Sequence, residues 1–220
     1  TLNLSNATLT GNGTIDNAGT LNVSGSNSID ANIENAGTLN VTHGTSTLSG
    51  SITGNGSMSV KNSTVILSGS SDYTGSITVQ DGLLDVLGTI SNSTVNLQAG
   101  ATVQGGGEVG TTVLESGSVI SPGTSSTIGT LTVNGNLTVE EGAEYIANAK
   151  ADQALSTLTI QGVTLNNMAS DLVSVTGAAK LEGGDVSFAA LSGEVESGQV
   201  YRLLTAAGGV SGQFSSLTSP

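Results

Sequence analysis

The chain has 220 residues, of which 32 are Gly, two are Pro and none is Cys. Charged residues make up 10%, aromatic residues 2%, and the formal net charge is −13. With 4 Lys and Arg against 17 Asp and Glu, the chain lacks the clustered positive charge that binding to nucleic acid or anionic lipid requires. The absence of Cys excludes disulfide scaffolds, thiolate metal sites and Cys nucleophiles.

The distribution of apolar residues predicts a folded repeat protein. Hydrophobic residues make up 36% of the chain and the mean hydropathy is +0.14, which is too high for a disordered segment. No run of 18 apolar residues predicts a membrane helix. The chain starts at Thr1 without a signal peptide, so we expect it to be part of a longer protein.

A three-residue motif, aliphatic–small polar–aliphatic, recurs from the start of the chain. Successive motifs begin 19, 18, 19, 19, 18 and 36 residues apart. Their first residues are Leu2, Leu21, Leu39, Met58, Ile77, Val95 and Leu131. The last step is twice 18, which places a missing repeat at Val113. The longest echo is residues 15–23, which return as residues 33–41. Alternating apolar and polar residues indicate strands.

Each repeat carries two weaker apolar positions. One follows the motif by 6–9 residues: Leu9, Ile29, Leu48, Val65, Leu84, Val103, Ile120 and Leu137. The other follows it by 12–15 residues: Ile15, Ile33, Ile52, Ile90, Val109 and Ile128. Three short strands per 18–19 residues predict an all-β fold, a right-handed parallel β-helix with coils about 4.8 Å apart. An antiparallel sandwich or barrel is the main alternative, but it does not explain so constant a repeat.

The repeat also predicts polar stacking. Asn17 and Asn35 occupy equivalent positions, so their side chains are expected to form one rung of a hydrogen-bonded ladder. Small aliphatic residues suit a narrow interior, and Asn and Gly suit corners with a left-handed backbone.

The period fails after about residue 140, where four of the five aromatic residues lie. Strand-like runs continue at residues 158–160, 172–175, 185–188 and 200–204. Residues 147–156 are rich in Ala and charge, and are expected to form a loop or short helix. We therefore divide the chain into coils at 1–130, and last coils with a C-terminal β cap at 131–220.

Several segments of the second half resemble a known family. They are residues 121–123, 128–135, 170–177, 179–184 and, most specifically, 201–214. Together they resemble the end of a pertactin-like autotransporter passenger domain of type V secretion, including its autochaperone region. The resemblance covers about residues 121–217. Two stretches depart from the family by their extra length, Thr124 to Thr127 and Ala147 to Met168.

The resemblance implies a mode of secretion. A passenger crosses the outer membrane C-terminus first, through its own β-barrel translocator, which would follow Pro220. The C-terminal region then folds first and templates the coils behind it, so residues 121–217 would be a folding nucleus. The location implied is the bacterial cell surface or the surrounding medium.

Candidate chemical sites are few. His43 is the only His and is expected at a solvated corner. Residues 105–110 match GxGxxG but lack the following helix of a dinucleotide site, so a Gly-rich turn is expected. Residues 11–13 and 54–56 lack the Asp of calcium-binding nonapeptides. Scattered carboxylates are expected to be solvated surface rather than a calcium site: Asp81, Asp85, Glu140, Glu141 and Glu144. Asn-x-Ser/Thr sequons occur, for example at Asn6, Asn62 and Asn92, but a chain rich in Asn and Thr contains them by composition, so we do not interpret them as glycosylation sites.

We therefore expect no catalytic, cofactor or metal site. The favoured function is an adhesin that binds a host or glycan surface or associates with itself, as many such passengers do in aggregation and biofilm. The alternative is a stalk that carries an N-terminal effector such as a protease or lipase. A third interpretation, a glycan-processing enzyme, would need carboxylates that converge on one site. The seven acidic residues before residue 111 are widely spaced, and Lys61 is the only Lys or Arg in that part of the chain.

Overall fold

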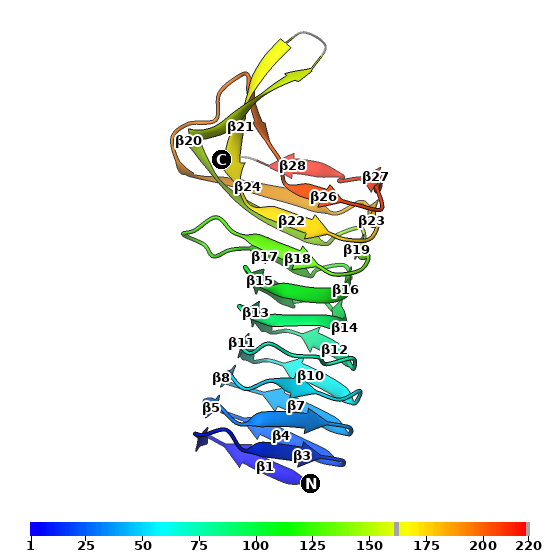
Figure 1. The fold of residues 1–220 in the computed structure, drawn as a ribbon. Helices are drawn as coiled ribbons and strands as arrows, with labels where there is room; N and C mark the ends of the chain where they lie inside the picture. Colours follow the sequence, from blue (N-terminus) through cyan, green and yellow to red (C-terminus); the bar gives the residue numbers. More distant parts are fainter. Residues whose placement is uncertain (161–162, 219–220) are drawn as a thin grey trace.

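The computed structural model describes residues 1–160 and 163–218, which form strands, turns and bends without any helix. The strands stack as successive coils and build an elongated rod (Figure 1). Every named strand pair is parallel except β20 with β21. The prediction of an all-β parallel β-helix is confirmed.

The first face of the rod carries the recurrent motif. Leu2 pairs with Leu21, Met58 pairs with Ile77, and Ile77 with Val95. Its strands are β1 (Leu2–Ser5), β4 (Thr20–Ser24), β7 (Thr38–Thr42), β10 (Ser57–Lys61), β12 (Ser76–Gln80), the second halves of β14 (Thr89–Leu97) and β16 (Glu108–Leu114), β19 (Leu137–Val139), β23 (Ala179–Glu182) and β27 (Val210–Gln213).

The second face follows the first across a short corner. Its strands are β2 (Thr8–Leu9), β5 (Asn27–Ile29), β8 (Thr45–Leu48), β11 (Thr64–Leu67), β13 (Leu83–Val86), β15 (Thr102–Gly105), β17 (Val119–Pro122), the start of β20 (Glu144–Ile160), β24 (Asp185–Ser192) and β28 (Ser216–Thr218). Beside it, β21 (Val163–Ser170) and β25 (Gln199–Tyr201) extend the sheet sideways.

The third face completes the triangle. Its strands are β3 (Thr14–Asn17), β6 (Asn32–Asn35), β9 (Ile52–Thr53), the first halves of β14 and β16, β18 (Thr130–Val133), β22 (Leu172–Val175) and β26 (Leu204–Ala206). Between β9 and β14 the strand is reduced to a single bridge from Ser70 to Thr89.

Alternating side chains fill the interior. In β4, for example, Leu21 and Val23 are fully buried while Thr20, Asn22 and Ser24 are only partly covered. Burying one such aliphatic side chain contributes roughly 1.5–3 kcal/mol. A single coil has no buried partner of its own, so this stabilisation depends on its neighbours.

Two stacks of glycine bring the backbones of adjacent coils close together. A Cβ added at Gly37 would collide with the carbonyl oxygen of Gly19, and the same holds for Gly56 on Gly37 and Gly75 on Gly56. The second stack behaves alike and comprises Gly50, Gly69, Gly88 and Gly107. The high Gly content of the chain therefore has a steric cause at these corners.

The structure corrects the predicted register after Val95. On the first face Val95 pairs with Thr112, and Thr112 pairs with Leu137. The first-face strand that we expected to be missing at Val113 is therefore present. Leu137 lies on the first face and not, as expected, on the second. The motif at Leu131 lies on the third face, where Val133 pairs with Val109.

A loop inserted after β17 causes this error. Residues 123–129 leave the coil and turn back, with mutual backbone hydrogen bonds between Thr124 and Thr127 at 3.0 and 3.3 Å. The seven residues of the loop displace every later motif along the sequence. The 36-residue step from Val95 to Leu131 therefore does not correspond to two regular repeats. Ile128 accordingly lies in the loop and not on the third face.

The coils also continue beyond residue 140, where the period is lost from the sequence. The β19 strand pairs with β23, and β23 pairs with β27. Longer insertions separate these strands, the largest being the β20–β21 hairpin that projects from the rod (Figure 1). Residues 147–156 belong to β20, so the prediction of a loop or helix there is wrong. The ladders pass through residue 130 without a break.

Aromatic residues gather in the last coils. The Tyr145 and Phe214 rings lie 6.3 Å apart, and the Phe188 and Tyr201 rings meet edge to face at 4.6 Å. Such pairs add about 0.5–1.5 kcal/mol beyond the burial of their area. Beyond them, β27 and β28 are exposed along their whole length.

Candidate interaction surfaces

A continuous polar stripe runs along the outside of the first face. Its central column joins small polar residues that are paired in register between neighbouring strands: Asn3, Asn22, Asn40, Ser59, Thr78 and Asn96. The Asn22 Nδ2 donates to Asn3 Oδ1 at 2.8 Å, and Asn40 Nδ2 donates to Asn22 Oδ1 at 2.9 Å. The stripe ends where Asn96 Nδ2 donates to Glu115 Oε1 at 2.7 Å.

Two further columns lie on either side of the central column. The first residue of each strand forms one of them: Thr20, Thr38, Ser57, Ser76 and Thr94. The last residue of each strand forms the other: Ser24, Thr42, Lys61 and Gln80. From β4 to β12, Lys61 is the only charged residue in these three columns. We call these three columns the polar stripe.

The predicted asparagine ladder exists inside the rod. The Asn17 Nδ2 donates to Asn35 Oδ1 at 2.7 Å, and both side chains are buried. Tyr73 supplies the next rung, because its hydroxyl accepts from Asn35 Nδ2 at 3.0 Å and donates to the Gly56 carbonyl at 2.7 Å. Burial raises the pKa of Tyr73, so the phenol stays protonated and available as a donor. Only its status as the single aromatic residue of the regular coils could have drawn attention to Tyr73.

A buried carboxylate joins the inserted segments at the other end of the molecule. Asp171 Oδ1 accepts from the Gly129 amide at 2.7 Å. Its Oδ2 accepts from the Asn148 amide at 2.8 Å and from Asn148 Nδ2 at 2.9 Å. Asn148 Nδ2 also donates to the Thr124 carbonyl at 3.2 Å. The loop 123–129, β20 and β22 therefore meet at one side chain.

Burial dominates the electrostatics of this network. Asp171 has no exposed surface, and desolvation raises its pKa although the three donors oppose that shift. Nearby, burial and the negative charge of Asp171 both raise the pKa of Tyr145, whose hydroxyl donates to the Leu203 carbonyl at 2.7 Å. No sequence pattern singled out Asp171 beyond its place in a segment of family resemblance.

The structure places the other candidate residues apart from one another. His43 lies exposed at the corner between the first and second faces, as predicted, with a φ of 57°. Residues 105–110 run from the end of β15 into β16, and no helix follows among the described residues. Asp81 lies at the same corner as His43, and Asp85 lies on β13.

The remaining carboxylates do not form a cluster either. Glu140 and Glu141 lie in the turn before β20, and Glu144 on β20 accepts a hydrogen bond from Ser187. Within residues 1–160 and 163–218, no group of three or more His, Cys, Asp or Glu side chains could hold a metal ion.

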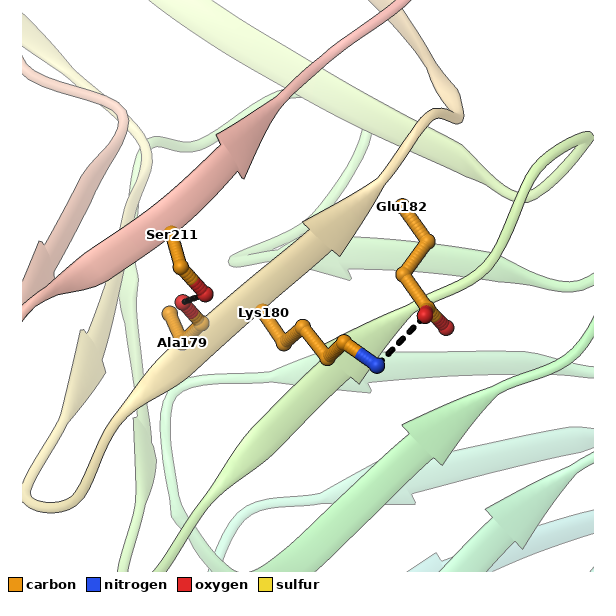
Figure 2. A network of polar contacts seen from close by, with 4 residues as sticks. All are labelled: Ala179, Lys180, Glu182 and Ser211. Carbon is orange, nitrogen blue, oxygen red and sulfur yellow. Dashed lines mark hydrogen bonds and ion pairs between the residues drawn. The ribbon is translucent and has the colours of Figure 1, made fainter.

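One ion pair is found in the described part of the chain. Lys180 Nζ lies 2.5 Å from Glu182 Oε1 on β23, beside the contact of Ser211 with the Ala179 carbonyl (Figure 2). Both charged side chains are largely exposed, at 61% and 42%. Exposed pairs of this kind contribute at most about 1 kcal/mol, so salt bridges are not what stabilises the rod.

No helix suited to crossing a membrane occurs among the described residues. No protein-family model matches the chain, and comparison with curated proteins finds no significant similarity.

Proposed function

We propose that this chain is a non-enzymatic, surface-displayed part of an autotransporter passenger, and that it acts in adhesion or self-association. The observation that carries the proposal is the polar stripe. It offers hydrogen-bond donors and acceptors in regular rows and carries almost no charge, on a molecule whose net charge is −13. Two such faces can approach without the repulsion that the rest of the surface would cause.

The size of the polar stripe sets the expected strength. Six strands spaced about 4.8 Å apart, each contributing about five residues, cover roughly 500 Å². Stable complexes bury about 800 Å² on each partner, so a single pair of rods should bind weakly. Many rods on two opposed cell surfaces would bind strongly through multivalency. This is the behaviour that adhesion between cells requires.

The family resemblance supplies the rest of the proposal. The protein would be exposed on the bacterial cell surface or secreted, with its own β-barrel translocator as partner. Residues 121–217 would act as the folding nucleus, which fits the aromatic pairs and the Asp171 network in that part of the chain.

Sedimentation velocity over a range of protein and salt concentrations tests self-association. We expect reversible dimers that salt does not dissociate, because the contacts are hydrogen bonds between neutral groups. The double variant Asn22→Asp, Asn40→Asp adds like charges to the polar stripe and should abolish the dimer. A matched control, Ser28→Asp with Thr47→Asp, adds the same charges to paired positions on the second face and should retain it. A strict monomer at all concentrations would refute self-association.

The second candidate is a stalk beneath an N-terminal effector such as a protease or lipase. The scattered positions of the acidic residues and of His43 favour it over an enzyme contained in these coils. The sequence that precedes Thr1 in the full protein discriminates the two. Further coils of 18–19 residues would favour the adhesin, and a globular domain with a catalytic motif would favour the stalk.

A further inference from the structure

A hollow lined mainly by polar residues lies at the corner between the first and second faces, formed by β11, β13, β15 and the turns that precede them. It is a shallow depression, largely open to solvent, with a volume of about 540 Å³. The side chains that the argument uses are Asn62, Thr64, Asp81, Leu83, Thr102 and Gln104. They come from three successive coils, so the hollow runs along the rod.

Three glycines also line the hollow: Gly44, Gly82 and Gly100. A Cβ added at each would meet the preceding coil, namely the Gly25 backbone, the Ser63 carbonyl oxygen and the Asp81 carboxylate, so these glycines allow close contact between coils. Gly44 and Gly100 have φ values of 74° and 76°, and the corner residues between them, Asn62 and Asp81, share this left-handed backbone at 49° and 47°. Asn62 and Asp81 therefore place short polar side chains at two successive corners, and Gly100 places none at the next.

Five polar side chains of the hollow make no hydrogen bond to any described residue: Asn62, Thr64, Asp81, Thr102 and Gln104. The hydroxyl of Ser63, which also lines the hollow, donates to the Gly44 carbonyl at 3.2 Å. On the polar stripe, by contrast, Asn3, Asn22 and Asn40 bond to one another. The five side chains of the hollow face solvent side by side, so a polar ligand could take the place of the water that they bind.

We propose that this hollow binds a neutral oligosaccharide. Two carboxamides, two hydroxyls and one carboxylate can donate to and accept from the hydroxyl groups of a sugar, and Leu83 offers a small apolar surface to a ring face. The lining has no cationic side chain, and Asp81 and the net charge disfavour anionic ligands. A single carboxylate is also too few for a divalent cation.

This inference rests on the proposed function only for the source of the ligand, since an adhesin that displays the hollow could bind a glycan of another cell. The hollow and the polar stripe use different residues. Loss of self-association in the stripe variant would leave glycan binding intact, and a glycan-binding defect would leave the dimer intact. The two proposals can therefore fail separately.

The test begins with the fluorescently labelled 220-residue chain on a printed array of neutral and acidic glycans, followed by titration calorimetry with the neutral glycan retained best. The variants Asp81→Gly and Gln104→Ala should each weaken binding about tenfold, the usual effect of losing one hydrogen bond to a ligand. Gly keeps the left-handed corner at position 81, so that variant should fold normally.

Two matched controls should bind as the parent does. Asn6→Gly removes a polar side chain from an equivalent left-handed corner, and Gln153→Ala removes an exposed Gln from β20. Three results would overturn the proposal: retention of no neutral glycan, a preference for acidic glycans, or unchanged affinity in both Asp81→Gly and Gln104→Ala.

Discussion

At the scale of single residues, close contact between the backbones of neighbouring coils restricts which residues fit at the corners. The stacked glycines of two corners each face a carbonyl oxygen of the coil before them. At the third corner a left-handed residue recurs, supplied by Asn, His, Asp or Gly: Asn6, Gly25, His43, Asn62, Asp81 and Gly100. Small changes at these places act on the neighbouring coil as well as on their own.

Gly56→Ala should destabilise the rod by about 1–3 kcal/mol, because its methyl group would collide with the Gly37 carbonyl oxygen and force the two coils apart. Gly13→Ala is the matched control, since nothing lies within 4 Å of a Cβ there. It should change the free energy of unfolding by less than about 0.5 kcal/mol. Urea unfolding of both variants measures the difference, and equal stability would contradict the steric account.

At the scale of elements, the strands could be predicted from the sequence only where no insertion interrupts the coils. Where coils follow one another directly, the spacing predicts the strands and even the contact between Asn17 and Asn35. Beyond Val95 the loop 123–129 and the β20–β21 hairpin break the count, although the pairing of Val109 with Val133 keeps the coils stacked. Periodicity cannot tell an inserted loop from a missing repeat, since both add residues between motifs.

The candidate sites were harder to predict for a related reason. Asn62 and Asp81 stood out as a sequon and as a carboxylate, but nothing in the sequence placed them beside Gln104 around one hollow. Tyr73 reaches its rung of the ladder from a segment without a regular strand. Lateral contacts of this kind depend on the length of each corner, which the repeat motif does not encode.

Asp171 connects the loop 123–129 and β20 to the start of β22, and the free energy of unfolding should change as Asp171 titrates. Burial raises its pKa, so the folded protein holds the proton to higher pH than the unfolded chain does. Its contribution to stability is therefore complete below the unfolded pKa, near 3.8, and is lost as the pH rises through the folded pKa. The variant Asp171→Asn lacks this titration and has only one oxygen to serve three donors.

We expect Asp171→Asn to be less stable than the parent by about 1–3 kcal/mol at acidic pH, with the gap narrowing toward neutral pH. Free energies of unfolding from urea titrations between pH 3 and pH 7 measure this gap. A gap that widens as the pH rises would show that the ionised carboxylate is the favoured form in the folded state.

At the scale of the whole molecule, stability passes from coil to coil. Because each coil buries its apolar residues against its neighbours, folding can start wherever a nucleus is stable and spread from there. The aromatic pairs and the Asp171 network add contacts that the regular coils lack, and for this reason we propose that the nucleus lies in the C-terminal coils.

Deletion of residues 145–217 should therefore leave residues 1–130 sensitive to protease or aggregated. Limited proteolysis of the refolded deletion variant, compared with the full chain, measures the protection. As a control, deletion of residues 159–164 shortens the projecting hairpin and keeps the pairing of residues 166–168 with β25, both aromatic pairs and Asp171, so protection should persist. A variant without 145–217 that resists protease as the full chain does would contradict a C-terminal nucleus.

The parallel ladders also determine how the rod would respond to a pulling force. The hydrogen bonds between coils run along the rod axis, so tension applied at its two ends loads one coil boundary at a time. Each detached coil of 18 or 19 residues frees about 60 Å of extended chain where it had spanned about 4.8 Å. A tether built this way lengthens in steps and limits the tension on whatever it holds, and each coil can re-form on its neighbour when the load falls.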